Sequence, residues 1–255
     1  MDDASKSRLI EEINEVSQHY HSGKLAGVND IYHIYVRDYL ISLTGGDSAL
    51  EVGCGSGLWT RLLCERYNSV DIVDGSAELL AKVAEENKGR QANITTHHML
   101  VEDFVNQPLQ RWEHIYITFL LEHLLDPVDV LSRLKDRLLD HGVLFLSVPN
   151  ALSVHRVIAH RMGLIDDPQQ LSENDRMMGH KRVYTRALMH DHLTRAGLDV
   201  INLETITLKP LSLAQMDDWS VEMALGFCES REMGPDNGAY IVATARRRQI
   251  AADAI

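Results

Sequence analysis

Apolar and polar positions change their period repeatedly along this chain. From residue 48 onward, short apolar runs alternate with stretches whose apolar residues recur every three or four positions, which predicts alternating strands and helices. The runs predict strands near residues 48–53, 69–74, 94–100, 114–120, 142–148, 200–208 and 239–246. The intervening stretches predict helices near residues 58–67, 76–88, 127–139 and 185–196. Such alternation is typical of an α/β fold with a parallel sheet and helices on both faces.

Two further helices are predicted ahead of the first strand. Residues 5–20 show an amphipathic pattern, and residues 30–43 show a second pattern that is unusually aromatic. The aromatic side chains either pack against the main sheet or belong to a lid that excludes water from a ligand. In the lid interpretation, Tyr20, Tyr32 and His33 are the candidates for contacting the substrate.

Composition limits the class of protein. A chain of 255 residues with 45% hydrophobic residues can bury a sizeable core in one large domain. Its net charge of −12 disfavours nucleic acid as a partner. The polar, acidic start predicts no signal peptide, and the longest apolar run, residues 115–125, is too short for a membrane span. Three scattered cysteines fit a reducing compartment, so we expect a cytoplasmic protein without membrane insertion.

Gly53, Gly55 and Gly57 follow the first predicted strand at alternate positions and precede a helix. Glycine adopts positive φ and allows close approach of a ligand, and a helix N-terminus offers free N–H groups. A dinucleotide turn would need glycine or alanine at Leu58 or Thr60, and a P-loop would need a Lys-Ser/Thr pair. The turn therefore matches neither a dinucleotide-binding turn nor a P-loop.

With Glu51 ahead of them, the three glycines complete an (Asp/Glu)-x-Gly-x-Gly-x-Gly motif that resembles class I S-adenosylmethionine (SAM)-dependent methyltransferases. The resemblance implies that Gly53, Cys54, Gly55 and Gly57 pack against the methionine part of the cofactor, and that Glu51 orients the turn or the cofactor amine. It also implies a Rossmann-like, seven-stranded doubly wound sheet of order 3-2-1-4-5-7-6 with a helical lid.

An acid ends the second predicted strand, where Asp74 precedes Gly75. Ligands of doubly wound sheets lie at the carboxyl ends of the strands, and a carboxylate there can accept two hydrogen bonds from a ribose diol. The resemblance implies that role for Asp74, with Gly75 beside it. The alternative is that Asp74 only caps the next helix.

A second pair of acids follows the third predicted strand. The resemblance implies that Glu102 or Asp103 binds the adenine amino group and that Phe104 flanks the adenine ring. The sequence does not choose between the two acids. The alternative is a pair of acids that only stabilises a helix start.

Residues 116–127 contain a Leu-Glu-His stretch that ends in Asp-Pro. This stretch resembles the branch that includes the ubiquinone and menaquinone methyltransferases, and it implies that Phe119 lies beside the cofactor. His123 is a candidate general base. The favoured alternative is that Glu122 and His123 only hold the loop to the sheet.

Residues 150–184 interrupt the alternation, and a long insertion in a compact domain is usually functional. Its cationic side chains either indicate an anionic substrate or form a solvated face. Arg156, Arg182 and Tyr184 are substrate-binding candidates. His155 and His180 rank ahead of His123 as the catalytic base, because the pKa of histidine lies near working pH.

A second insertion, residues 209–232, contains Trp219, which either packs inside a helical face or walls the acceptor pocket. Thirteen histidines are present, but no pair has a convincing metal-binding spacing, so we expect no metal site.

These features predict an N-terminal helical lid over residues 1–44 and a SAM-binding domain over residues 45–255 with two cap insertions. The expected activity is methyl transfer from SAM to an oxygen or nitrogen atom of a small molecule, leaving S-adenosylhomocysteine (SAH). The rivals are a SAM-binding subunit without catalysis, an aminopropyl transferase and a nicotinamide-dependent oxidoreductase, the last disfavoured by the glycine spacing. A monomer or homodimer is expected.

Overall fold

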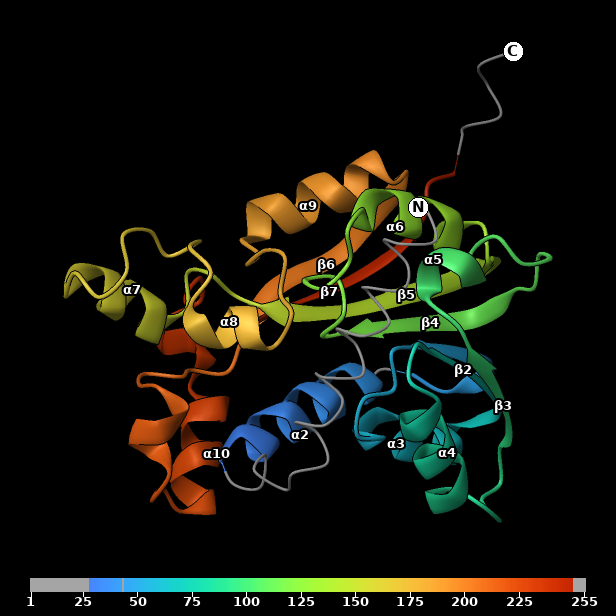
Figure 1. Cartoon of the computed structure of the whole chain (residues 1–255), viewed down its shortest axis with the longest axis horizontal. Helices are drawn as coiled ribbons and strands as arrows, with labels where there is room; N and C mark the ends of the chain where they lie inside the picture. Colours follow the sequence, from blue (N-terminus) through green and yellow to red (C-terminus); the bar gives the residue numbers. More distant parts are fainter. Residues whose placement is uncertain (1–27, 43, 250–255) are drawn as a thin grey trace.

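A computed structural model describes residues 28–42 and 44–249, which form one sheet covered by helices on both faces (Figure 1). The strands are β1 (Gly46–Val52), β2 (Tyr67–Asp74), β3 (Asn93–His98), β4 (Trp112–Thr118), β5 (Leu138–Pro149), β6 (Leu198–Ile206) and β7 (Tyr240–Arg247). Their order is β3-β2-β1-β4-β5-β7-β6, which confirms the predicted order. The helix predicted over residues 5–20, with Tyr20, lies outside the described residues.

All neighbouring strands pair in parallel except β7, which runs antiparallel to both β5 and β6. The last four residues of β1 and of β4 are buried, because helices cover both faces of the sheet there. The strand order reverses between β1 and β4. Their carboxyl ends therefore border the crevice where doubly wound sheets bind ligands.

Two helical layers enclose the sheet, and each has its own apolar cluster. One face carries α2 (Val28–Ile41), α3 (Leu58–Arg66), α4 (Ala77–Glu86) and α10 (Val221–Glu229); the other carries α5 (Val101–Phe104), α6 (Pro127–Lys135) and α9 (Arg186–Arg195) (Figure 1). Local sequence sets several of the helix starts. Asp126 caps α6 just ahead of Pro127, and Ser76 caps α4 through its hydroxyl.

Helix α2 packs as part of the core, although its residues belong to the predicted lid. Tyr32, Val36 and Leu40 are buried in the cluster that α2 shares with α3 and α10. The Tyr32 hydroxyl donates to the carbonyl oxygen of Leu208 at 2.8 Å. The core-packing interpretation of the aromatic pattern therefore describes most of this helix.

The two predicted insertions lie at one end of the molecule, at the left in Figure 1. The first carries α7 (Val154–Arg161) and α8 (Glu173–Met177), and the second carries η1 (Leu213–Met216), α10 and η2 (Arg231–Met233). Among the described residues, no helix combines the length and the apolar character that crossing a membrane requires.

A buried acid on β2 contacts the neighbouring strand β3 and the start of β4. Asp71 accepts hydrogen bonds from the Trp112 indole N–H at 3.0 Å and lies 2.7 Å from His97 Nε2. Its exposed fraction is 6%. Asp71 therefore stabilises the sheet, whereas Asp74 at the end of the same strand faces the crevice.

Replacing Asp71 by alanine should lower the free energy of unfolding by about 2–4 kcal/mol, because it leaves the buried indole N–H without an acceptor. Urea unfolding followed by circular dichroism measures the change. The control is Asp191→Ala on α9, which removes an exposed ion pair with Arg195 and should cost less than about 0.5 kcal/mol. Equal losses in the two variants would contradict a structural role for Asp71.

Candidate active site

The glycine turn leaves β1 with all three glycines at positive φ: 81° at Gly53, 48° at Gly55 and 84° at Gly57. A Cβ on Gly57 would lie 2.9 Å from Val83 Cγ2, so α4 leaves no room for a side chain there. A Cβ on Gly55 would meet nothing within 4 Å. The backbone at Gly55 is therefore open to a ligand, while Gly57 holds α3 close to α4.

Glu51 lies beneath this turn and is almost fully buried. Its Oε2 accepts a hydrogen bond from the Thr60 hydroxyl at 2.5 Å, and its Oε1 has no partner among the described residues. Burial raises the pKa of the Glu51 carboxyl to about 8, and the charge of Asp74 adds to the shift. Neither Glu51 nor Gly57 lines the cavity, although the sequence predicted both as cofactor-binding residues. Glu51 therefore acts on the turn from beneath, through its bond to Thr60 on α3.

Asp74 reaches the site from the end of β2 and is half-buried. Its Oδ2 accepts from the backbone N–H of Cys54 at 2.9 Å, and its Oδ1 accepts from the backbone N–H of Ser76 at 2.8 Å. The N-cap of α4 is Ser76, and Asp74 accepts from its backbone N–H, so Asp74 supports the start of α4 without being its cap residue. The carboxylate holds the turn in place and keeps further lone pairs for a ligand.

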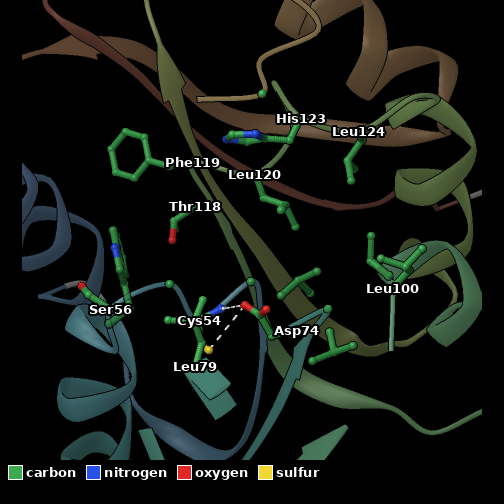
Figure 2. A pocket seen from close by; sticks show the side chains of 18 of the residues that line it. Cys54, Ser56, Asp74, Leu79, Leu100, Thr118, Phe119, Leu120, His123 and Leu124 are labelled. Atoms are coloured by element: carbon green, nitrogen blue, oxygen red, sulfur yellow. Dashed lines mark hydrogen bonds between the residues drawn. The ribbon is translucent and has the colours of Figure 1, made fainter. Parts of the chain in front are cut away.

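One cavity opens over the carboxyl ends of β1, β2 and β4, with Asp74 and Cys54 on the side opposite Phe119 and His123 (Figure 2). Its volume is about 200 Å³, whereas a single water needs roughly 10–15 Å³ by the same measure. Nine of the predicted site residues line this cavity: His33, Gly53, Cys54, Gly55, Asp74, Gly75, Glu102, Phe119 and His123.

The structure separates the two acids that follow β3. Glu102 is half-buried and lines the cavity, and burial raises the pKa of its carboxyl. Asp103 and Phe104 do not line the cavity. The Phe104 ring lies 5.1 Å from the His97 ring, inside the core, because the single turn of α5 directs it inward. Leu100 and Val101 line the cavity where Phe104 was expected.

Phe119 closes the opposite wall of the cavity from the end of β4. Its φ of 54° places a bulky residue in the left-handed region, which is rare outside functional positions. The ring stacks on His33 with centroids 4.5 Å apart and meets the edge of Tyr240 at 5.1 Å. Tyr240 carried no sequence signal, because it opens a strand that is remote in the chain.

Of the three histidines predicted to be catalytic, His123 lines the cavity, whereas His155 and His180 do not. The His123 ring lies 4.7 Å from that of His180. His180 Nδ1 lies 3.2 Å from Asp175 Oδ1, and Asp175 also pairs with Arg156 at 3.0 Å. Burial, together with the charges of His180 and Lys181, lowers the pKa of His123 to about 3. His123 is therefore a neutral imidazole at physiological pH.

Glu122 forms a cluster with His123 and His180. It is almost fully buried, its Oε2 has no hydrogen-bond partner among the described residues, and burial raises its pKa to about 7. Donor atoms of Glu122, His123 and His180 all lie within 4.8 Å of one another, a spacing that one metal ion could bridge. The sequence did not show this grouping, because His180 comes from a distant loop.

The other residues predicted to bind substrate are engaged in holding the fold. Arg182 donates to the backbone carbonyl oxygens of Leu121, Leu124 and Leu125, and Arg156 donates to Asp175 and two carbonyls. These arginines bind the loops that carry His123 and α8. Their charge is therefore used internally.

Tyr184 is fully buried, with its hydroxyl 3.2 Å from His192 Nδ1, and Trp219 stacks on Phe227 with centroids 4.8 Å apart. Neither residue lines the cavity, and Tyr32 does not line it either. His155 does not line it, and its Nδ1 is buried without a partner among the described residues. The apolar periodicity in the sequence around these residues therefore reflects packing in the fold and not a binding site.

Comparison with known proteins identifies related chains. A family model described as a methyltransferase domain matches residues 10–203. A ubiquinone biosynthesis O-methyltransferase of Glaesserella parasuis serovar 5 (strain SH0165) is 26% identical over 127 residues, which cover 48% of this chain and 53% of that relative. A tRNA U34 carboxymethyltransferase of Alteromonas mediterranea is 35% identical over 114 residues, which cover 42% of this chain and 33% of that relative. The chain thus spans about half, or less, of the length of these relatives.

The fold also matches solved structures. The N-methyltransferase NodS from Bradyrhizobium japonicum WM9, solved in complex with SAH, superposes with a TM-score of 0.59 at 12% identity. The match covers 93% of this chain and 99% of that chain. At this identity, the likeness concerns the arrangement of strands and helices.

Replacing Asp74 by alanine should remove the rise in melting temperature that SAH causes in the wild type, because a ribose diol loses its charged acceptor. Two hydrogen bonds to a carboxylate correspond to about 3 kcal/mol, or about a hundredfold in affinity. Thermal shift and calorimetric titration measure both quantities.

Asp74→Asn preserves an acceptor for the turn and separates loss of binding from loss of the turn, which circular dichroism checks. Asp103→Ala is the matched control. Asp103 is an acid that follows the neighbouring strand β3 in the chain, but it does not line the cavity. Wild-type SAH affinity in both Asp74 variants would show that the ribose assignment is wrong.

Proposed function

The chain belongs to the methyltransferase domain family, and from that premise we propose that it transfers a methyl group from SAM to an oxygen or nitrogen atom of a small molecule. The cavity that the glycine turn, Asp74 and Glu102 line carries the proposal, and the unpartnered carboxyl oxygen of Glu51 beneath the turn supports it. A buried acid with an unused acceptor costs stability unless a donor arrives, and the ammonium of a methionine moiety is such a donor.

Each part of the cavity has a role in this proposal. Gly53, Cys54 and Gly55 hold the methionine part, Asp74 accepts the ribose hydroxyls, and Glu102 accepts from the adenine amino group. Leu100 and Val101 supply the apolar contact for the adenine ring. When bound, SAM supplies an activated methyl group. The protein then needs to align the acceptor atom and exclude water.

The acceptor is proposed to lie between His33 and Phe119 on one side and His123 on the other. These three side chains line the same cavity as the glycine turn. Because α2 packs over this end and supplies His33, it serves as the inner part of the lid predicted from the sequence. The lid limits the access of water to the methyl group.

His123 replaces His155 and His180 as the residue proposed to act on a hydroxyl substrate. Its lowered pKa keeps the ring neutral and makes it a weak proton acceptor, so its role is to accept a hydrogen bond that orients the substrate hydroxyl. His180 and Asp175 position the ring from behind. An amine acceptor that arrives neutral needs no base.

A small-molecule acceptor is proposed over a nucleic acid, although one relative is a tRNA-modifying protein. The net charge of −12 opposes the approach of a polyanion. Methyl-labelled SAM tests this proposal when it is offered with a panel of small phenols, hydroxy acids and amines, or with a tRNA transcript. Label transferred to the tRNA alone would contradict the proposal. SAM binding without transfer to any acceptor would favour the non-catalytic alternative.

Replacing His123 by alanine should lower kcat/KM for a hydroxyl acceptor by about tenfold, because the substrate hydroxyl loses a hydrogen-bond acceptor worth about 1–1.5 kcal/mol. SAH affinity should stay at the wild-type value, because His123 faces the acceptor end of the cavity. The control is His160→Ala on α7, an exposed residue away from the cavity.

Turnover measured with and without EDTA distinguishes a hydrogen-bond acceptor from a metal ligand. We expect no effect of the chelator, in keeping with the absence of a metal site proposed from the sequence. Activity that EDTA removes and zinc or magnesium restores would instead assign Glu122, His123 and His180 to a metal ion.

A further inference from the structure

We infer that the end of the molecule formed by the two insertions binds a second copy of this chain, with α7 of each copy packed on α10 of the other. This surface is separate from the cavity, because no residue of α7 or α10 lines the cavity. The pairing therefore goes beyond the proposed function and does not depend on it.

Exposed apolar side chains gather at this end of the molecule. Among the described residues, fifteen large apolar side chains are exposed, and ten of them belong to the insertions at residues 150–184 and 209–232. Each insertion contributes five. Apolar side chains that gather on one part of a surface mark an interaction site, whereas single scattered ones do not.

Helix α7 has no buried face. None of its eight residues is buried, and Met162 and Leu164, just after it, are 66% and 69% exposed. The rest of the fold holds the backbone of α7 at its first turn, where the N–H groups of Val154 and His155 donate to carbonyls at 3.1 and 3.2 Å. So short a helix is not stable in water alone and gains its stability from packing. Its outer part, at the far left in Figure 1, therefore offers a face for a partner.

Helix α10 is apolar on almost every side. Ala224 and Cys228 are buried in the cluster that α10 shares with α2, but Val221, Met223 and Leu225 on its other sides are exposed. A helix with apolar residues all round is normally covered all round. The described residues of one copy cover only one side of α10, so the other side is suited to a partner.

The two helices carry opposite charges. Helix α7 contains no acid, and Arg161 in its last turn is exposed and forms no ion pair with a described residue. Helix α10 contains no basic residue, and Glu222 and Glu229 on it are exposed. Gly226 shares their face, and a Cβ there would meet nothing within 4 Å, so a second helix can approach closely.

These charges favour a second copy as the occupant. In a two-fold dimer the contact of α7 with α10 occurs twice, so one basic helix and one acidic helix on the same chain satisfy each other in both directions. An anionic lipid surface would attract α7 but repel the acids of α10, and the net charge of −12 opposes its approach.

The pairing also reaches the cavity through the first insertion. Arg156 on α7 pairs with Asp175 on α8 at 3.0 Å, and Asp175 lies 3.2 Å from His180. Gly179 and Lys181, on either side of His180, line the cavity. A second copy packed on α7 therefore stabilises the loop that closes the acceptor end.

The test is the mass of the full chain in solution, measured without cofactor by sedimentation equilibrium. One copy has a mass of 28.8 kDa, and we expect twice this mass at micromolar concentration. Met162→Glu and Met223→Glu should each raise the dimer Kd at least about a hundredfold, because each places two charges in the apolar contact. The matched control is Leu109→Glu, which changes an exposed apolar residue ahead of β4 and should leave the Kd unchanged.

Charge reversal tests whether α7 and α10 face each other. Arg161→Glu alone should raise the dimer Kd at least about tenfold, because it sets like charges against each other. Adding Glu222→Lys and Glu229→Lys should restore most of the wild-type affinity. A general loss of stability would not produce this rescue, and all three side chains are exposed, so circular dichroism should show the wild-type fold.

A wild type that is monomeric at every concentration would overturn the inference, and so would a dimer whose Kd both methionine variants leave unchanged. Failure of the reversed charges to rescue Arg161→Glu would contradict the pairing of α7 with α10. A monomer that sediments with phosphatidylglycerol vesicles would assign this face to a lipid surface instead. None of these results involves SAM, so SAH binding and methyl transfer test the proposed function separately.

Discussion

The site depends on the backbone conformation of the turn that leaves β1. Its three glycines all have positive φ, and the N–H of Gly53 donates to the Val73 carbonyl at the end of β2. Asp74 then accepts from the N–H of Cys54, which joins the end of β2 to the same turn. Two adjacent strands thus hold the turn open, and a side chain at Gly57 would displace α4. The crevice at the switch between β1 and β4 exists because of these contacts.

Burial determines the electrostatics of the cavity. It raises the pKa values of Glu51 and Glu122 and lowers those of His33 and His123, so that each group tends toward its neutral form. A neutral imidazole beside the acceptor can accept a hydrogen bond from it, and a neutral acid beneath the turn would ionise in response to an incoming ammonium. Groups with shifted pKa values gather at functional sites, because a cavity that excludes water shifts the pKa values of its side chains and also favours the chemistry.

The two ends of the cavity are built differently. The donor end consists of backbone turns and acids at strand ends, which tolerate little variation in geometry. The acceptor end is assembled from α2, the loop after β4 and the loop with Gly179 and Lys181, which are remote in sequence. Tyr240 packs against this end through Phe119, a contact that only the fold brings about.

The sequence alone determined the alternation of strands and helices, the glycine turn and the acids at the ends of β2 and β3, because those features depend on local spacing and on the two periods of hydrophobicity. The strand order was implied by the resemblance to class I methyltransferases, and the structure confirms it. Tertiary structure decided which polar side chains reach the cavity. Arg156, Arg182 and Tyr184 have suitable chemistry but satisfy buried carbonyls and acids, whereas Glu102 faces the cavity and Asp103 does not. A sequence shows which groups a side chain carries. Only packing determines whether those groups are used inside the fold or remain free for a ligand, since most buried polar atoms are hydrogen-bonded within the fold.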